Sequence, residues 1–451
     1  MNQRIRRLAI ALLVLYAILF VQLNVWQVGR KSDLDADSRN MRQTVRDFND
    51  PRGPILTIDG KKIAYSKRSA PGSTHPWRRV YSDGELYSAV TGYYTFAYGA
   101  TQVERVMNDV LAGRTAEQQV KGLGALFHGG DTTGSVVLTI DSRIQAAARR
   151  ALGDREGSVV VVDVRTGAVK ALWSWPSFDP NFLTTDDDSL VGDILEVLQD
   201  VPGDPLLANA YQQRYMPGST FKILTTAAAL DAGVVDLARV FDTESEFLPP
   251  QTNDPITNYK NKVCGGDLTE VFRRSCNTPF ARLSLEVGPE RMVAAAQRFG
   301  IGEPVPLDLP RPASSTFGTV EYFRENLPLL AIGGFGQGNT QMVPLHMALV
   351  AAAVANGGTM MKPYVVDSTR DHAGGLLSRT RPTAWKQAMT PETATVLTGL
   401  MEQVVENGTA SCCFKLANGV RAAAKTGTAQ LNRSEEHTSE LQSRQYLVCR
   451  L

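Results

Sequence analysis

Residues 216–230 read MPGSTFKILTTAAAL and place Ser219 and Lys222 three residues apart at the start of an apolar segment. Pro217 and Gly218 interrupt the chain just before them, so a helix is predicted to begin near Ser219. Residues three apart on a helix are neighbours, so Lys222 is expected to lie beside Ser219. Two interpretations are open: Ser219 is a helix N-cap followed by a surface lysine, or it is a nucleophile followed by its base.

The chain contains a second copy of PGST at residues 71–74, which serves as an internal comparison. In PGSTHP, Pro76 occupies the position that Lys222 holds in the first copy. This copy therefore has no base three residues after its serine, and it is predicted to be a turn.

Two more short motifs follow in order: SCN at residues 275–277, and KTG at residues 425–427 within AAAKTGTAQ. Each motif alone is a weak signal. An SxxK motif followed by SxN and then KTG is typical of penicillin-binding proteins and serine β-lactamases. The ordered set favours the nucleophile interpretation of Ser219.

The residue types fit an acyl-transfer reaction. A serine hydroxyl needs a base, and Lys222 can be that base only if burial or a neighbouring cation lowers its pKa. Ser275 is expected to relay the proton toward a leaving amine. Asn277 offers a donor and an acceptor to a substrate amide and to Lys222.

The KTG segment is expected to bind substrate. Lys425 supplies a positive charge beside the pocket, Thr426 supplies a hydroxyl for a carboxylate, and Gly427 allows a substrate strand to approach closely. The backbone N–H groups of Ser219 and Thr428 are expected to form an oxyanion hole.

The first thirty residues predict a membrane anchor. MNQRIRR precedes a run of fourteen apolar residues, Leu8–Val21, and the apolar character continues to Trp26. At helical rise this segment nearly spans a bilayer. The following QLNVWQVGRKSD has no small-x-small cleavage site, which favours an uncleaved anchor over a signal peptide. Three arginines before the run against Arg30 and Lys31 after it give a weak positive-inside bias.

Composition describes the rest of the chain as globular. The 451 residues are 43% hydrophobic and 21% charged, which is enough for two or three domains with cores. The net charge is +1, and we find no zinc-finger, P-loop or RNA-binding signature, so no nucleic-acid partner is expected.

Several segments carry clear secondary-structure signals. The predictions are a helix over 101–113, a strand from 135 leading into a helix capped by Asp141, a β-hairpin over 157–176 that turns at 165–167, a buried helix over 343–355, and a helix opened by Thr390 and Pro391.

No metal site or cofactor is predicted. Residues 181–193 are acidic and are expected to form a solvated loop, because no His, Cys or Glu stands at ligand spacing near Asp186, Asp187 and Asp188. The five histidines are scattered singly along the chain.

The five cysteines leave one alternative open. Cys264 lies twelve residues before Cys276, and an extracytoplasmic location would permit a disulfide between them. The alternative is two buried thiols. Cys412 and Cys413 are adjacent, and no bridge is expected between them.

With these motifs in this order, the sequence resembles a class B penicillin-binding protein, in the penicillin-binding protein A branch. The resemblance covers residues 1 to about 431, and it rests on PRGPIL at 51–56, residues 86–113, SFDPN at 177–181, RYMPGSTFK at 214–222, SCNTPFA at 275–281, GQGNTQMVPLHMA at 336–348 and AAKTGTAQ at 423–430.

The resemblance implies an α/β (α+β) fold: a transpeptidase domain of the penicillin-binding and serine β-lactamase type, with a central antiparallel sheet flanked by helices. A transmembrane helix and an elongated pedestal domain precede it. The expected domains are a cytoplasmic N-terminus and anchor at 1–30, a non-catalytic pedestal at 31–134, and a transpeptidase domain at 135–432.

It further implies a D,D-transpeptidase of the cell membrane, with a cytoplasmic N-terminus and an extracytoplasmic catalytic domain. Ser219 would attack the D-alanyl-D-alanine of a peptidoglycan stem peptide and pass the acyl group to an amine of a neighbouring stem. β-Lactams would acylate the same serine. The other roles fall on Lys222, Ser275, Asn277, Lys425 and Thr426, with Thr428 as oxyanion donor. The resemblance also implies a chain without a glycosyltransferase domain and a membrane glycosyltransferase as its partner.

Three other functions make different demands on the sequence. A serine β-lactamase needs a deacylating group, and no ExxLN-like segment lies between SCN and KTG. A β-lactam sensor should carry several membrane segments, and the sequence shows one. A non-catalytic scaffold is expected to have lost one of the three motifs, and none is lost.

The C-terminal nineteen residues are expected to be foreign to the protein. RSEEHTSELQS at 433–443 resembles the translation of a sequencing-library adapter, so 433–451 is predicted to be an artefact and the transpeptidase domain to be truncated. Loss of the strands that should follow KTG would leave the edge of its strand bare.

Overall fold

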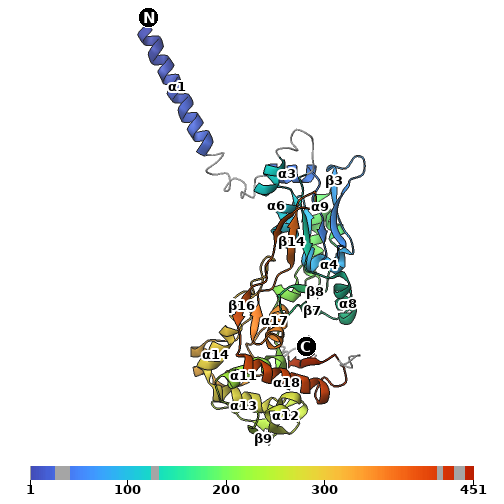
Figure 1. Ribbon diagram of the computed structural model, residues 1–451, viewed down its shortest axis with the longest axis vertical. Helices are drawn as coiled ribbons and strands as arrows, with labels where there is room; N and C mark the ends of the chain where they lie inside the picture. The colour runs from blue at the N-terminus through green and yellow to red at the C-terminus, as the bar shows by residue number, and fades with distance from the viewer. Residues whose placement is uncertain (1, 26–40, 123–131, 414–419, 431–441, 451) are drawn as a thin grey trace.

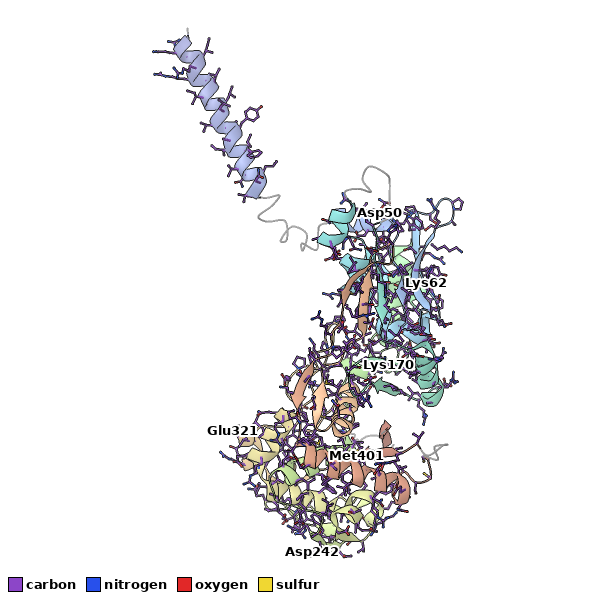
Figure 2. The ribbon with its side chains drawn as sticks, viewed as in Figure 1. Asp50, Lys62, Lys170, Asp242, Glu321 and Met401 are labelled. Atoms are coloured by element: carbon purple, nitrogen blue, oxygen red, sulfur yellow. A yellow bond between two sulfur atoms is a disulfide. The ribbon has the colours of Figure 1, made fainter. Side chains whose placement is uncertain are left out.

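The computed structural model describes residues 2–25, 41–122, 132–413, 420–430 and 442–450. Figure 1 shows an elongated molecule with a sheet-rich part around β3 (Trp77–Tyr81) and a helix-rich part around α18 (Pro391–Asn407) at opposite ends. Lys62 lies in the sheet-rich part, whereas Met401, which is completely buried, lies inside the helix-rich part (Figure 2).

The first element, α1 (Asn2–Asn24), extends away from the rest of the chain (Figure 1). Its apolar side chains are exposed; Leu13 and Phe20 are each 69% accessible. An 18-residue stretch within Gln3–Asn24 has a mean hydropathy of 2.0, and by length and composition this helix suits a membrane span.

A six-stranded mixed sheet forms the centre of the sheet-rich part. Its order is β15-β14-β6-β1-β2-β3, with β1 parallel to β6 and the other neighbours antiparallel. The strands are β1 (Ile55–Leu56), β2 (Lys62–Arg68), β3, β6 (Ser135–Leu138), β14 (Val366–Arg370) and β15 (Leu376–Arg379). Strands from both sides of the expected 134/135 boundary therefore share one sheet, and the boundary stays a prediction.

A buried cluster of ion pairs connects residues in and next to this sheet to the helix that carries Glu104. Glu104, on α5 (Gln102–Val106), accepts from Arg52 Nε at 2.6 Å and from Arg79 Nε at 2.7 Å, and all three side chains are almost fully buried. The two guanidinium groups hold the pKa of Glu104 below its usual value, although burial alone would raise it.

The prediction of one continuous helix over 101–113 is wrong. The chain forms two short helices here, α5 and α6 (Asn108–Leu111), with a break at Met107. Arg52 donates to the carbonyl of Glu104 at 2.6 Å and to Asn108 Oδ1 at 2.7 Å, so a tertiary contact uses groups on both sides of the break.

The other predicted elements between 135 and 176 are confirmed. Asp141 caps α8 (Ser142–Leu152) by accepting from the backbone N–H groups of Arg143 and Ile144. β7 (Gly157–Val162) and β8 (Val169–Trp175) form the antiparallel hairpin. The helix over 343–355 is observed as the buried α17 (Pro344–Ala355), and Thr390 caps α18.

The acidic segment is a correction. Instead of a loop through Asp193, α9 (Asp188–Asp200) begins within it, and Asp187 is its N-cap, accepting from the N–H groups of Ser189 and Leu190. Val191 and Leu195 are buried on its inner face. The run of aspartates thus includes a helix start, because an Asp side chain satisfies free N–H groups of a first turn.

The lower part surrounds one buried helix, α11 (Lys222–Asp231), which follows the 3₁₀ turn η4 (Gly218–Phe221). β17 (Ala422–Gln430) lies between η4 and α18. The remaining elements are α3 (Met41–Asn49), α4 (Gly84–Thr91), β4 (Tyr94–Thr95), β5 (Gly99–Ala100), α7 (Ala116–Gly122), η3 (Pro180–Leu183), α10 (Asn209–Gln212), β9 (Val240–Glu244), β10 (Glu246–Phe247), β11 (Ile256–Thr257), η5 (Tyr259–Asn261), β12 (Cys264–Asp267), α12 (Leu268–Arg273), α13 (Thr278–Val287), α14 (Pro289–Arg298), α15 (Val320–Glu325), α16 (Leu327–Gly333), β13 (Thr359–Met361) and β16 (Ala384–Gln387).

The KTG strand has a partner on one edge. β17 pairs antiparallel with β18 (Gln442–Arg450), from Ala422 opposite Arg450 to Gln430 opposite Gln442. The expectation of a bare strand is wrong for this edge. Most of RSEEHTSELQS lies outside the described residues, and the foreign origin of the tail stays a prediction.

The buried ion cluster yields a stability prediction. We expect Glu104→Gln to lower the free energy of unfolding by about 3–5 kcal/mol, because it leaves two buried guanidinium groups without a counter-charge. Urea unfolding followed by circular dichroism measures this. Glu85→Gln is the control: it removes the exposed ion pair with Arg149 and should cost less than about 1 kcal/mol. Equal losses for the two variants would contradict the prediction.

Candidate active site

Ser219 lies inside a helical turn rather than at its cap. η4 begins at Gly218 and α11 begins at Lys222, and Pro217 and Phe221 occupy their N-cap positions. Gly218 has φ 53°, and a Cβ there would lie 2.5 Å from the carbonyl oxygen of Thr428. The N-cap interpretation of Ser219 is therefore wrong, and the turn that carries it is held against β17.

Lys222 is completely buried, so the surface-lysine interpretation is also wrong. Its Nζ donates to the carbonyl oxygen of Ser275 at 2.8 Å, to Asn277 Oδ1 at 2.9 Å and, more weakly, to Ser275 Oγ at 3.4 Å. Burial lowers the pKa of Lys222 well below its usual value, and the charge of Lys425 lowers it further. These are the conditions under which a lysine acts as a base at neutral pH.

Lys425 reaches the same serine from the opposite side. It lies on β17, is completely buried, and donates from Nζ to Ser275 Oγ at 2.8 Å and to the carbonyl oxygen of Thr426 at 3.0 Å. Burial lowers its pKa to about 7. The Ser275 hydroxyl thus lies within hydrogen-bond distance of both lysines.

The loop that carries Ser275 joins α12 to α13 and is covalently tied. Ser275 has φ 59°, an uncommon conformation for a residue with a Cβ. Cys276 forms a disulfide with Cys264 of β12, with the two Cα atoms 5.9 Å apart. The predicted disulfide is confirmed. Cys412 and Cys413 are free thiols, as expected.

Asn277 is fixed by two neighbours that the sequence did not single out. Its Nδ2 donates to the carbonyl oxygen of Thr257 at 3.1 Å, and its backbone N–H donates to Asn258 Oδ1 at 2.6 Å. Asn258 lies nineteen positions earlier and outside any catalytic motif, so spacing gave no signal for it.

The substrate-binding residues predicted on β17 have the following neighbours. Thr426 Oγ1 lies 2.7 Å from Thr409 Oγ1, another group that sequence reasoning missed. A Cβ on Gly427 would lie 2.8 Å from the carbonyl oxygen of Pro217 and from Thr220 Cγ2. The close approach that Gly427 permits in this structure is therefore to η4. Thr428 follows in the same strand, and its oxyanion role stays a prediction.

This arrangement suits nucleophilic catalysis with proton relay. Within the described ranges, the hydrogen bonds of Lys222 Nζ go to Ser275 and Asn277. Proton transfer from Ser219 needs Nζ to come within hydrogen-bond reach of its hydroxyl, and such contacts commonly tighten only when substrate binds. The Ser275 hydroxyl lies within hydrogen-bond distance of both lysines, and its role as a proton relay stays a prediction.

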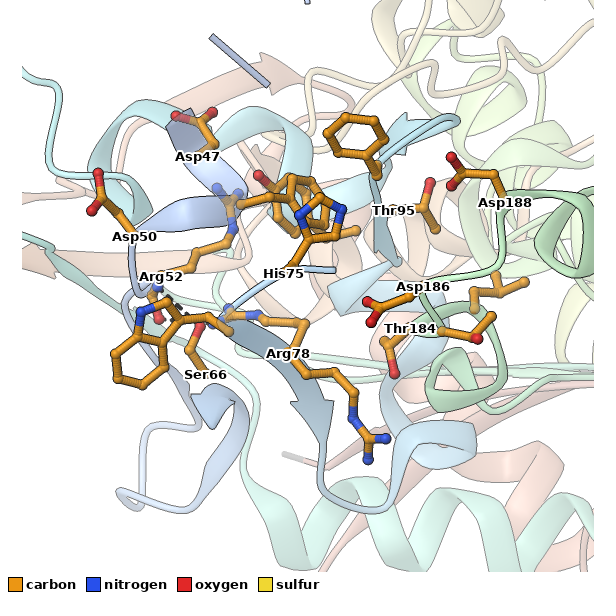
Figure 3. A pocket seen from close by; sticks show the side chains of 17 residues that line it. Asp47, Asp50, Arg52, Ser66, His75, Arg78, Thr95, Thr184, Asp186 and Asp188 are labelled. Atoms are coloured by element: carbon orange, nitrogen blue, oxygen red, sulfur yellow. Dashed lines mark hydrogen bonds between the residues drawn. The ribbon is translucent and has the colours of Figure 1, made fainter. Parts of the chain in front are cut away.

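A separate pocket lies in the sheet-rich part, away from Ser219. Figure 3 shows Asp47 and Asp50 on one side of His75, with Thr184, Asp186 and Asp188 on the other. Arg52, Arg78 and Arg79 also line it, so its walls mix both charges. The residues predicted for catalysis do not line this pocket.

Comparisons with known proteins agree with the motif order. The sequence model of the penicillin binding protein transpeptidase domain matches residues 157–448, and that of the penicillin binding protein A dimerisation domain matches residues 52–137. Over 443 residues the chain is 37% identical to the peptidoglycan D,D-transpeptidase PbpA of Mycolicibacterium smegmatis, covering 95% of this chain and 87% of that protein.

Solved structures show the same fold. The crystal structure of PBPA from Mycobacterium tuberculosis is 31% identical, with a TM-score of 0.82 over 89% of this chain and 91% of that one. The ceftriaxone acyl-enzyme complex of penicillin-binding protein A from the same organism has a TM-score of 0.83 at 31% identity, over 90% of this chain and 91% of that one.

The buried Lys425 makes stability depend on pH. Its pKa is about 7 in the folded chain and about 10.4 in an unfolded one, so the unfolded chain binds more protons between these values. The free energy of unfolding should therefore rise with pH from about 7 to about 10, by up to about 1.4 kcal/mol per pH unit.

Urea unfolding between pH 7 and 9 measures this slope. Lys425→Met should lower it by up to about 1.4 kcal/mol per pH unit and leave the share that Lys222 contributes, whereas Lys62→Met, which changes an exposed side chain, should leave it unchanged. An equal slope in the wild type and in Lys425→Met would show that the folded state does not depress this pKa.

Proposed function

Because the chain belongs to the penicillin-binding protein transpeptidase family, in the class B, penicillin-binding protein A branch, we propose that it is a peptidoglycan D,D-transpeptidase that β-lactams inhibit by acylating Ser219. One observation carries the assignment of residues. The three motifs meet at the Ser275 hydroxyl: Lys222, 53 positions before it, has its Nζ at 3.4 Å, and Lys425, 150 positions after it, has its Nζ at 2.8 Å.

The first half-reaction forms the acyl-enzyme. Ser219 Oγ attacks the carbonyl carbon of the penultimate D-alanine while its proton passes to neutral Lys222. The negative charge on the carbonyl oxygen is stabilised by the backbone N–H groups of Ser219 and Thr428. The C–N bond then breaks, and the leaving D-alanine amine receives a proton through Ser275.

The second half-reaction reverses the proton path. An amine from a neighbouring stem peptide attacks the acyl-serine, loses a proton to Lys222, and Ser219 leaves with a proton restored. Lys425 and Thr426 bind the terminal carboxylate of the donor, which leaves as part of D-alanine. A β-lactam follows the first half-reaction, but its cleaved amide stays attached to the acyl group and cannot diffuse away.

The two lysines divide the work by charge. Burial lowers the pKa of both, and the charge of Lys425 lowers that of Lys222 further. With its pKa well below the usual value, Lys222 can lose its proton at neutral pH and act as a base. Lys425 keeps its charge to about pH 7, where it attracts the substrate carboxylate.

We further assign an extracytoplasmic position to the catalytic part, with α1 as the anchor and the N-terminus in the cytoplasm. The Cys264–Cys276 disulfide supports this orientation, because stable disulfides are typical of oxidising compartments. The anchor (1–30), pedestal (31–134) and transpeptidase domain (135–432) keep the proposed boundaries, and a membrane glycosyltransferase is the proposed partner.

The exposed Cys412 and Cys413 allow a test of orientation. The test uses intact cells whose outer wall layers let small reagents through. A membrane-impermeant maleimide should label the protein in these cells. In a chain that also carries Cys449→Ser, changing both residues to serine should abolish the label. Labelling only after membrane disruption would place the catalytic part in the cytoplasm.

The nucleophile is tested with a fluorescent penicillin. Ser219→Ala should abolish covalent labelling, whereas Ser73→Ala, in the second PGST copy, should label like the wild type. Gel fluorescence and mass mapping of the labelled peptide measure this. Undiminished labelling of Ser219→Ala would refute the assignment.

Loss of the base should slow the same reaction. We expect Lys222→Ala to lower the acylation rate by several orders of magnitude, about 10³-fold or more, because the serine hydroxyl loses its proton acceptor. Stopped-flow acylation kinetics measure it. Rapid turnover of a chromogenic β-lactam by the wild type would favour a serine β-lactamase instead.

A further inference from the structure

The first turn of α13 is capped in an unusual way. Asn277 occupies the N-cap position, but within the described residues its side chain makes no cap hydrogen bond. Its amide is used elsewhere: Oδ1 accepts from Lys222 Nζ and Nδ2 donates to Thr257. The free N–H groups at the start of α13 therefore need another acceptor.

Asn258, nineteen positions before Asn277, accepts from two of these free N–H groups. It follows β11 directly and is 3% exposed. Its Oδ1 accepts from the backbone N–H of Asn277 at 2.6 Å and from that of Thr278 at 3.1 Å. These are the N–H groups at the start of α13.

The Asn258 amide is itself held in one orientation. Its Nδ2 donates to the carbonyl oxygen of Glu244 at 3.0 Å and to Thr278 Oγ1 at 3.2 Å. Rotation of the amide by 180° would place NH₂ against two N–H donors, so the observed orientation is strongly preferred.

The neighbouring residue fixes the orientation of the Asn277 amide. Because the carbonyl oxygen of Thr257 accepts from Nδ2 at 3.1 Å, Oδ1 of Asn277 faces Lys222 Nζ at 2.9 Å. With the opposite orientation, an NH₂ group would face the amine of Lys222. Residues 257 and 258 together hold both the backbone and the amide of Asn277.

We propose that Asn258 is a positioning residue for acylation: it holds the first two N–H groups of α13, fixes the backbone of Asn277 and thereby keeps Asn277 Oδ1 on Lys222. This proposal rests on the proposed function for the identity of the reaction. Among the described residues, Asn258 makes no hydrogen bond to Ser219, Lys222 or Ser275. It acts through Asn277, whose Oδ1 accepts from the Lys222 amine.

The central experiment is a double-mutant cycle on the full chain in detergent, read by the rate of acylation with a fluorescent penicillin. Asn258→Ala should lower this rate by about 10- to 100-fold, since a misplacement of about 1 Å costs up to about 100-fold. In the Asn277→Ala background, the same change should lower the rate less than about threefold. Multiplicative effects of the two changes would overturn the proposal.

A matched control separates positioning from loss of stability. Asn181 makes a similar pair of hydrogen bonds to the backbone of Tyr81, from Nδ2 at 2.8 Å and to Oδ1 at 2.9 Å, in the sheet-rich part. Asn181→Ala should lower the melting temperature without changing the acylation rate. If it slowed acylation as much as Asn258→Ala, the effect would be one of general stability and the proposal would be wrong.

A crystal structure of Asn258→Ala decides the point without relying on the reaction. It should show Asn277 Oδ1 moved beyond hydrogen-bond distance of Lys222 Nζ. An unmoved Asn277 would refute the positioning role. If the wild type failed to react with penicillin at all, the proposed function would fail, and this structural comparison would still decide the role of Asn258.

Discussion

Two lysine side chains withdrawn from water beside one serine hydroxyl are the constraint on which the helix-rich part of the structure depends. Burying an ammonium group is costly unless it is hydrogen-bonded or loses its proton. Lys222 meets this demand with two oxygen acceptors of the SCN loop, and Lys425 with Ser275 and its own strand. The site therefore needs three chain segments to stay in register within a fraction of an ångström.

Different kinds of interaction hold these segments in place. η4 and β17 approach so closely that Gly218 and Gly427 leave no room for a Cβ. The SCN loop is tied by the disulfide to β12 and by Asn258 to the end of β11. Steric fit, a covalent bond and hydrogen bonds act on the same small region. They oppose movement of any one segment relative to the others.

Local signals in the sequence predicted much of this fold, because caps and turns act over a few residues. The Asp141 cap, the 157–176 hairpin and the Thr390–Pro391 helix start are of this kind. The same holds for the residue types of the site, since SxxK, SxN and KTG are short motifs. Long-range contacts were not predictable: Arg52 binds on both sides of the break between α5 and α6, and Asn258 reaches a helix nineteen residues later. The acidic run was misjudged because one of its aspartates is a cap with buried apolar residues behind it.

The sheet that joins β14 and β15 to β6 and β1 connects a late segment of the chain, residues 366–379, to an early one. About 230 residues separate β6 from β14, and the whole site is formed by the chain that passes between and after them. During synthesis at the ribosome, this sheet stays incomplete until residue 379 has emerged. The sheet-rich part is therefore among the last to complete its folding. A chimera that takes its first 130 residues from a relative would also need that relative's β14 and β15, which complete the sheet.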